Sequence, residues 1–488
     1  MSDRRTVLLL AWLALTSICC SEDVRQADTP PGPAVQMPRL HAEGRDILTD
    51  QGDPVLLRGV NLGSWLFHEN WISAVDYPLH GRIFVLGREA GIGDEVEAVL
   101  RQLGPGSDAA WLARFRAALE ARIGKPAVDD FLEQVALYPE IYDDSDLLLR
   151  LRLEARFGTV GRDRLLDAFW GAWILEADIA WIAAQGFNVV RVPIGYRNLV
   201  TSSDNEPLTA LPWNERAFQR IDALLAWCEK HEVYAVLDIQ EAPGGQNDYS
   251  GPSRLYEDPL MQELTVQLWQ EISRRYAQRN VVAAYSLLAE PFGAPSTRAR
   301  DDMFDRLVRA IRGPGDDHLL VIHDGFFGMW TLPVPAALGW EGVVYSTHLF
   351  EFGVTNLPGY QLLAAFYDCL FNAAQGGQQV PYYIGSFSTM KDEDYAYQGL
   401  ELLVDLYERS GWSWSLWTYK KIDDPIDEEL FGASTSWGLR GRLASDFERP
   451  DVHRDDEAAL LGKLGAYSGV VLNPNERLLG ILRDRPSP

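Results

Sequence analysis

The sequence has no long hydrophobic run, and its basic residues are outnumbered by acidic ones. The apolar stretch from Thr6 to Ile18 is about 13 residues, whereas a membrane-spanning helix needs ~20. With 44 Lys and Arg against 70 Asp and Glu, the formal net charge is -26. Such a chain is repelled by nucleic acid and by anionic membranes. We therefore expect no nucleic-acid partner and no integral membrane span, whereas neutral polymers such as glycans remain open.

Cysteine and histidine are also scarce, with 4 and 8 residues respectively. Their spacing includes no HExxH, CxxC or paired-histidine motif, so a metal-centred mechanism has no visible ligands. We expect no metal and no cofactor.

The N-terminal segment is typical of exported proteins. Two arginines precede the apolar run, and a stretch rich in acidic residues and proline follows it. This pattern predicts an export signal at residues 1–20 and a linker at residues 21–38. Cys19 and Cys20, directly after the run, are candidate lipid-attachment sites. The expected location is secreted, periplasmic or associated with the cell envelope.

The remaining chain, residues 39–488, has the composition of a folded protein, since 47% of the whole sequence is hydrophobic and it contains 16 Trp. Two short β-like runs open it, and eight apolar runs follow, mostly separated by helical patterns. Continuous apolar runs are typical of parallel strands buried on both faces. The runs are 56–63, 187–195, 234–240, 281–291, 319–325, 342–350, 382–388 and 412–420. The pattern predicts an α/β fold, a (β/α)8 barrel with an N-terminal β-hairpin and a helical insertion at about 68–166, after the first strand.

In such a barrel the site lies at the C-terminal ends of the strands, so polar residues there are the first candidates. They are Arg191, Asp238, Gln240, Glu290, His348, Ser386 and Trp417. The insertion starts after the first strand, so we expect it to cover this face and narrow the cleft. Cys228 and Cys369 lie in amphipathic stretches on opposite sides of the barrel, and we expect two buried free thiols.

Three segments resemble glycoside hydrolase family 5, particularly its exo-β-1,3-glucanase branch. They are "LLRGVNLGSWLFHENWI", "GAWILEADIAWIAAQGFNVVRVPIGY" and "EAPGGQN", and the similarity runs in order from about residue 40 to 420. The resemblance implies a retaining glycosidase with an acid/base Glu after strand four and a nucleophilic Glu ending strand seven. One carboxyl protonates the leaving oxygen, and the other attacks the anomeric carbon.

Only half of that pair is present. Glu290 matches the acid/base, whereas the motif of strand seven reads "IGSFS" and places Ser386 at the nucleophile position. Around it, the family's Asn before the acid/base is Ala289, its Tyr beside the nucleophile is Phe350, and its His after strand three is Gln240. A serine glycoside is an ordinary acetal with an alkoxide leaving group, and serine lacks the charge that an oxocarbenium-like transition state requires. The resemblance therefore indicates a degenerate active site.

Other residues match positions that the family uses to hold the sugar. The resemblance gives these substrate-binding candidates: Glu69, Arg191, Tyr196, Gln240, Asn247, His348, Phe350 and Trp417. Three hypotheses stay open. The chain is a non-hydrolytic protein that binds β-glucan or a related β-glycoside, an active β-glycosidase with Glu290 as acid and a displaced base at Glu241 or Glu351, or a scaffold with a residual pocket.

Overall fold

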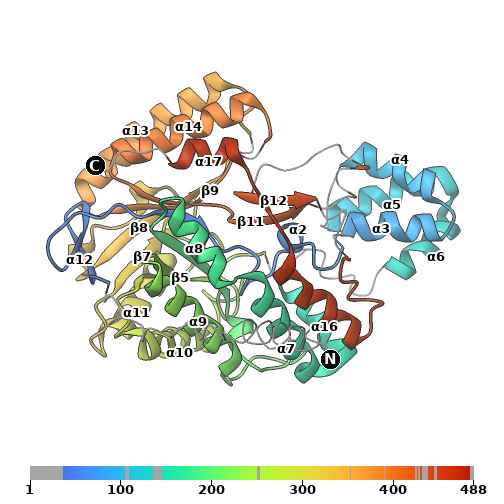
Figure 1. Cartoon of the computed structure of the whole chain (residues 1–488), viewed down its shortest axis with the longest axis horizontal. Coiled ribbons are helices and arrows are strands. Elements are labelled where there is room, and N and C mark those ends of the chain that lie inside the picture. Colours follow the sequence, from blue (N-terminus) through green and yellow to red (C-terminus); the bar gives the residue numbers. More distant parts are fainter. Residues whose placement is uncertain are drawn as a thin grey trace, which may run out of the picture. The chain divides into compact units, whose positions relative to one another are not determined.

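A computed structural model describes residues 37–483 except 78, 105–108, 136–145, 250–252, 352, 390, 424–425, 427–428, 431–437 and 444–447 (Figure 1). The predicted export signal, the linker up to residue 36 and the candidate lipid-attachment sites Cys19 and Cys20 lie outside the described residues. Within the described part of the chain, no helix combines the length and hydropathy needed to cross a membrane.

Eight parallel strands close into a barrel, which confirms the predicted fold class. Each of the eight predicted runs overlaps one of them. The strands are β3 (Arg58–Asn61), β4 (Val189–Gly195), β5 (Tyr234–Glu241), β6 (Val282–Ser286), β7 (Leu319–His323), β8 (Val343–Leu349), β9 (Tyr382–Phe387) and β10 (Ser413–Leu416), and β10 pairs with β3 to close the circle. Six of them have every residue buried (β4, β6, β7, β8, β9 and β10), as expected of strands covered on both faces.

Helices surround the barrel. They are α8 (Glu176–Ala184), α9 (Glu215–Lys230), α10 (Pro259–Tyr276), α11 (Thr297–Arg312), α12 (Pro335–Leu338), α13 (Leu357–Gln378) and α14 (Asp394–Arg409), with short 3-10 turns η1 (Tyr196–Leu199) and η2 (Met329–Thr331) between them. Several starts are set by polar caps: the side chains of Asn214, Asp258, Ser296 and Asn356 each accept a backbone N–H of the first turn.

The two helical cysteines differ in environment. Cys228 in α9 is buried and free, as predicted, but Cys369 in α13 is exposed. The expectation of two buried thiols was therefore wrong for Cys369. The residues of α13 that face the barrel include Tyr360, Ala364 and Phe371, and Cys369 lies on the other side of this stripe. Because α13 is apolar on most of its faces, its sequence does not show which face packs against the barrel.

The predicted N-terminal hairpin is present as β1 (Leu40–Glu43) paired antiparallel with β2 (Asp46–Thr49). It lies at the N-terminal end of the barrel. Arg39 contacts His318 at 2.6 Å, just before β7, and the Tyr234 hydroxyl at the start of β5 donates to the Pro38 carbonyl at 3.0 Å. The opposite end of the barrel is therefore free of the hairpin.

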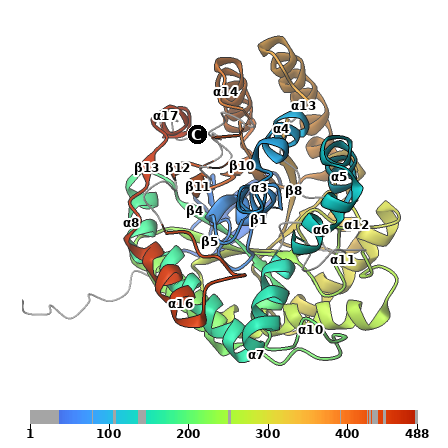
Figure 2. The ribbon, with the colours of Figure 1, turned by 90° about the vertical axis from the view of Figure 1, so that its right-hand side faces the viewer.

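Helices inserted after β3 form a lobe with its own core. After the short α2 (Asn70–Ser73) come α3 (Leu79–Glu89), α4 (Gly93–Leu103), α5 (Ala109–Ile123) and α6 (Lys125–Val135). Their apolar side chains cluster with Ile426 and Leu430 and apart from the barrel core. The long α7 (Asp146–Trp173) runs through residue 166, the expected end of the insertion, and packs in the barrel core. Figure 2 shows α3–α6 in front of the barrel.

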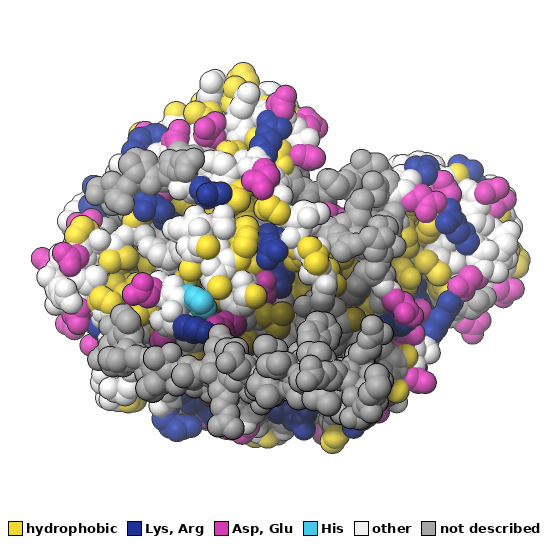
Figure 3. All heavy atoms as spheres, viewed as in Figure 1, with side chains coloured by type: hydrophobic (Ala, Val, Ile, Leu, Met, Phe, Trp, Pro, Cys, Tyr) yellow, Lys and Arg dark blue, Asp and Glu magenta, His cyan; other side chains and the backbone are white. Residues whose placement is uncertain are grey.

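The C-terminal part adds a small sheet of β11 (Lys420–Asp423), β12 (Arg440–Leu443) and β13 (Asn473–Pro474). Helix α16 (Glu457–Gly465) and turn η4 (Ala466–Gly469) contact α7, and α17 (Glu476–Arg483) contacts α14. On the face drawn in Figure 3, acidic and basic side chains are interspersed.

Candidate active site

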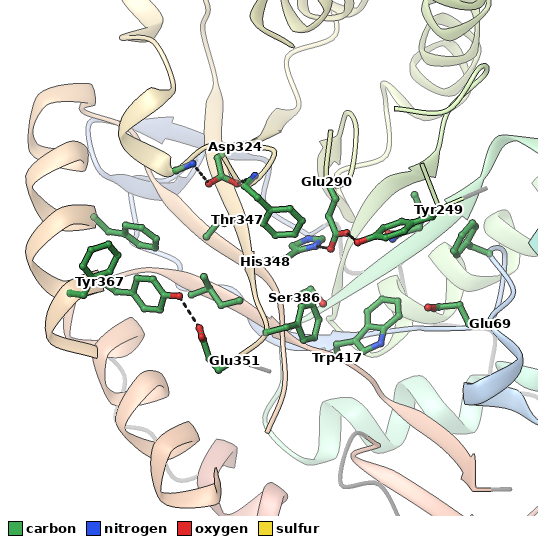
Figure 4. A pocket seen from close by; sticks show the side chains of 18 of the residues that line it. Glu69, Tyr249, Glu290, Asp324, Thr347, His348, Glu351, Tyr367, Ser386 and Trp417 are labelled. Carbon is green, nitrogen blue, oxygen red and sulfur yellow. Dashed lines mark hydrogen bonds and ion pairs between the residues drawn. The ribbon is translucent and has the colours of Figure 1, made fainter. Parts of the chain in front are cut away.

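A cavity of about 760 Å³ opens at the C-terminal ends of the barrel strands (Figure 4). Its walls come from the loop after β3, from β5, from the segments after β6 and β7, from the ends of β8 and β9, from α13 and from the residue after β10. The lining residues are Phe67, Glu69, Trp71, Gln240, Tyr249, Glu290, Asp324, Phe326, Gly328, Trp330, Thr347, His348, Leu349, Phe350, Glu351, Phe366, Tyr367, Phe371, Ser386 and Trp417. This is the end at which (β/α)8 enzymes carry their sites.

Glu290 lies in the middle of the cavity, four residues beyond the end of β6. Its carboxylate is held on both sides: Oε1 lies 2.6 Å from Nδ1 of His348, and Oε2 accepts a hydrogen bond from the Tyr249 hydroxyl at 2.7 Å. The backbone of Glu290 has a positive φ of 48°, a conformation that is costly for a residue with a side chain. Two side-chain contacts and a strained backbone fix this carboxylate at one place in the cavity.

The loop after β5 supports the backbone of Glu290. Asn247 donates from Nδ2 to the Glu290 carbonyl at 3.2 Å, and the buried Gln246 donates to the carbonyls of both Gln240 and Ala289. Gly293 is needed for this packing, because an added Cβ there would lie 2.6 Å from the Ser253 hydroxyl. The segment "EAPGGQN" therefore positions the acid/base candidate through backbone contacts.

His348, at the end of β8, is buried against Gly385 of the next strand. An added Cβ at residue 385 would lie 3.0 Å from Nε2 of His348 and 2.9 Å from the Ser346 hydroxyl, so the imidazole needs glycine there. Burial, with Arg191 nearby, holds the pKa of His348 well below its ordinary value. A neutral ring carries one N–H, and with Nδ1 as its donor it hydrogen-bonds the Glu290 carboxylate.

Ser386 lies in β9 and lines the same cavity as Glu290. Its side chain is buried, and its hydroxyl has no hydrogen-bond partner among the described residues. Figure 4 shows it between His348 and Trp417. The nucleophile position is therefore inside the cavity but carries neither a carboxylate nor a group that activates the serine.

Under the cavity floor, Arg191 organises a buried polar layer. It pairs with Asp238 at 2.8 Å and donates to Asn61 at 2.7 Å and to Gln240 at 3.2 Å. Arg191 and Asp238 were placed at strand ends by the sequence, but β4 continues to Gly195 and β5 to Glu241. Both residues thus lie in the strands, outside the lining of the cavity, and only Gln240 of this layer reaches the surface of the cavity.

One side of the cavity resembles a sugar-binding surface. Glu69, Trp71 and Trp417 line it, and Figure 4 shows Glu69 beside the indole of Trp417. Burial raises the pKa of Glu69 to about 8, and the negative charge of Glu290 adds to this effect. A neutral carboxyl offers both a donor and an acceptor, and an indole offers an apolar platform for a sugar ring.

The two candidate displaced bases have different positions. Glu241 does not line the cavity; it is buried and pairs with Arg197 at 3.2 Å. Its neighbour Gln240 lines the cavity, so the two adjacent side chains of β5 have different environments. Glu351 does line the cavity, where its carboxylate accepts a hydrogen bond from Tyr367 at 2.8 Å and burial raises its pKa.

Seven of the predicted site residues are brought together around the cavity: Glu69, Gln240, Glu290, His348, Phe350, Ser386 and Trp417. Three others are not in its lining, namely Arg191, Tyr196 and Asn247. The sequence analysis missed Tyr249, although it lies two residues after Asn247 in the same loop, and Trp71, although it lies in the quoted "HENWI". Of the described residues of the insertion, Glu69 and Trp71 alone line the cavity. Among the described residues there is no group of three or more side chains suited to a metal ion.

Comparison with known proteins places these observations in a family. Residues 158–422 match the sequence profile of the cellulase family, glycosyl hydrolase family 5. A β-xylosidase of Phanerodontia chrysosporium is 25% identical over 414 residues, which cover 79% of this chain and 71% of that protein. A glucan 1,3-β-glucosidase 2 of Wickerhamomyces anomalus is 32% identical over 169 residues, covering 33% and 38%. A crystal structure of an endogalactoceramidase shares the fold, with a TM-score of 0.51 and 18% identity over 88% of this chain and 85% of that one.

Proposed function

The chain belongs to glycosyl hydrolase family 5, and from this premise we propose that it binds β-glucan or a related β-glycoside without ordinary retaining hydrolysis. The observation that carries the proposal is the contrast inside one cavity. Glu290 keeps its two side-chain contacts, whereas the position opposite holds the hydroxyl of Ser386.

The chemistry of the retaining reaction supports the loss of turnover. A positioned general acid contributes roughly 10²- to 10⁴-fold, whereas enzymes typically achieve ~10⁶- to 10¹⁷-fold. Glu290 is the group suited to protonating a leaving oxygen, but no carboxylate is present at residue 386 to attack the anomeric carbon or to balance its positive charge. Without that charge, hydrolysis is expected to be very slow.

Binding a sugar requires hydrogen-bonding groups and a stacking surface but no nucleophile, and the cavity offers both. The neutral carboxyl of Glu69 supplies a donor and an acceptor, and Trp417 supplies a stacking surface. The relatives named glucan 1,3-β-glucosidase and β-xylosidase suggest a β-linked glycosyl group as the ligand. Ala289 and Gln240 replace an Asn and a His of the family, and each replacement removes a hydrogen bond worth about 0.5 to 1.5 kcal/mol. We therefore expect micromolar to millimolar affinity.

Calorimetry with laminari-oligosaccharides tests this proposal. We expect saturable heat with the wild type and a weaker signal with Trp417→Ala, in a variant whose folded state is checked by near-UV circular dichroism. The same samples are analysed for released glucose. Absent heats in the wild type, or equal heats in both proteins, would contradict glycan binding.

A second candidate is a weak hydrolase with a displaced base. The observation that favours it is Glu351, a carboxylate in the cavity whose pKa is raised by burial and which could activate a water. Its hydrogen bond with Tyr367 and its place toward the other end of the cavity in Figure 4 argue for a structural role. Sugar release that disappears in Glu351→Gln and persists in Glu241→Gln would establish the hydrolase instead.

We further propose that the protein is exported and that Cys19 or Cys20 carries a lipid. The support is the sequence pattern of residues 1–20 alone. Metabolic labelling with a radioactive fatty acid should mark the wild type and not the Cys19→Ala, Cys20→Ala double variant.

A further inference from the structure

The cavity has a second end with a different character. Beyond His348, away from Glu69 and Trp417, its walls become aromatic and aliphatic (Figure 4). The side chains that ring contacts join at this aromatic end are Trp330, Phe366, Tyr367 and Phe371. They come from the segment after β7 and from α13, whereas the sugar-binding side comes mainly from the loop after β3 and the residue after β10.

The rings of the aromatic end form a path from solvent into the protein. Trp330 and Phe366 are about half exposed, at 49% and 46%, and their ring centroids lie 6.4 Å apart. Phe366 contacts Tyr367 at 5.8 Å, and Tyr367 stacks on the buried Phe371 at 4.9 Å. A long apolar group that follows this path would touch rings along its whole length.

The polar groups of the aromatic end are already engaged. Asp324 accepts hydrogen bonds from the backbone N–H groups of Phe326 and Gly328, both at 3.1 Å, and is also bonded by Thr347. Glu351 accepts from Tyr367. Because these donors already occupy part of the acceptor capacity of Asp324 and Glu351, a sugar placed there would have to share both carboxylates with them. A hydrocarbon chain has no such requirement.

The outer face of α13 extends this apolar surface. Helix α13 has 22 residues and a single charged one, Asp368, whereas the 16 residues of α11 include eight charged ones. Leu362 is 75% exposed, one turn before Phe366 on the same face. In Figure 3, hydrophobic side chains appear over the end of the α13–α14 pair. An exposed apolar surface that continues a ligand cavity is typical of a binding site for an apolar group.

We propose that the aromatic end binds the alkyl chain of an amphiphilic β-glycoside, whose sugar occupies the side lined by Glu69 and Trp417. The ligand class is a glycoside with a long hydrocarbon aglycone, of the kind that glycolipids and alkyl glucosides share. This inference rests on the proposed glycan binding, since the sugar side supplies the head-group contacts. Glu290 then lies between the two ends, next to the glycosidic oxygen that joins sugar and chain.

The experiment compares methyl, hexyl and octyl β-D-glucoside with laminaritriose, all below the micellar concentration, by calorimetry on the full chain. Each buried methylene is expected to tighten binding up to about fourfold, until the chain fills the aromatic path. Trp330→Ala and Phe366→Ala should remove most of this dependence on chain length and leave the Kd of laminaritriose unchanged. Val471→Ala, which shortens another exposed apolar side chain, should change neither.

Four outcomes would overturn the inference. Equal affinity for the three glucosides means that no chain is bound, although laminaritriose binding would still support the proposed function. Loss of laminaritriose binding in Trp330→Ala means that the aromatic end is a sugar subsite. Octyl glucoside binding that is unaffected by Trp417→Ala means that a chain is bound without its sugar. Light scattering completes the test, because a dimer that dissociates in Leu362→Asp would assign this face to a second copy of the chain.

Discussion

The ends of strands β6 and β9 face one cavity, but the polar side chains that they carry differ in their hydrogen bonds. After β6, Glu290 keeps a neutral histidine, a tyrosine hydroxyl and a loop that holds its backbone. On β9, Ser386 has a hydroxyl with no partner among the described residues, and Phe350, which lines the same cavity, has no hydroxyl.

The difference shows that the side-chain contacts of the acid/base candidate do not involve the side chain at residue 386. The contacts of Glu290 come from β8 and from the loop after β5, so they do not depend on what residue 386 is. Where a carboxylate is absent, a phenylalanine fills space without leaving a buried polar group unpaired. Under the function proposed above, the protein keeps a site for a sugar but lacks the charge that the retaining reaction needs.

Replacing Ser386 by a carboxylate should have the largest effect, which is on the rate of hydrolysis. Ser386→Glu puts a carboxylate opposite Glu290, and we expect hydrolysis of an aryl β-glucoside to rise by roughly 10²- to 10⁴-fold over the wild type. Adding Phe350→Tyr, which restores the tyrosine that the family resemblance places beside the nucleophile, should raise the rate further. The measurement is release of the aryl alcohol under single-turnover and steady-state conditions.

The matched control is Ser386→Gln, which has the same size but no charge and should stay inactive. Activity in the glutamine variant would show that shape and not charge was missing. If Ser386→Glu is inactive both alone and combined with Phe350→Tyr, with the fold intact, Glu290 is no longer competent as the general acid.

A second change breaks the packing between the halves. Gly385→Ala would place a methyl group 3.0 Å from His348 and 2.9 Å from Ser346 and should lower the free energy of unfolding by about 1–3 kcal/mol. It should also displace the imidazole from Glu290. Gly376→Ala in α13, where an added Cβ meets nothing within 4 Å, is the control and should be neutral or stabilising by up to ~1 kcal/mol. Chemical denaturation of the wild type and the two variants measures this difference. Equal midpoints would show that β8 and β9 shift to accept the methyl group at little cost.

A third change separates the sugar side from the rest of the cavity. Trp417→Ala removes the stacking surface and should weaken laminaritriose binding by about 0.5–1.5 kcal/mol, which is up to about tenfold. Trp330→Ala removes a tryptophan of the same cavity at its other end and should not. If both variants lose the same affinity, the two ends form a single sugar-binding groove.

Much of this fold was predictable, because parallel barrel strands are long apolar runs with helical patterns between them. The eight strands, the hairpin and the insertion follow from periodicity alone. The strand ends were harder, since Arg191 and Asp238 look like terminal polar residues but are buried in the strands and paired with each other. A polar residue inside an apolar run gives no sign of whether its partner is solvent or another strand.

The site was predictable only where a motif carried it. Glu290, Ser386 and Trp417 follow from the family resemblance and line the cavity. Tyr249 was missed because its role depends on a contact between loops that are 41 residues apart. The aromatic end was missed for a similar reason, since the rings of α13 are indistinguishable in sequence from core residues. Their exposure depends on which side of the helix the barrel covers.

The last expected effect concerns the protonation of Glu69 on the sugar side of the cavity. Its pKa is raised by burial from 4.5 to about 8, so the folded protein keeps this proton over a pH range in which the unfolded chain has released it. The folded state therefore binds more protons between about pH 4.5 and 8, and stability from this group falls as the pH rises through that window. In Glu69→Gln the side chain is neutral at every pH, so this decline should be absent. We expect the wild type to lose about 1–2 kcal/mol more of its free energy of unfolding than the variant between pH 5 and pH 9. This amount is well below that of the full pKa shift because the side chain is partly exposed.

Laminaritriose affinity at pH 6 should be nearly equal in the two proteins, since glutamine offers the same donor and acceptor as a protonated carboxyl. Denaturation curves across this range, with the exposed Glu401→Gln as control, measure the difference. Parallel pH profiles for wild type and Glu69→Gln would show that Glu69 is ionised in the cavity, and the sugar side would then bind its ligand through a charged group.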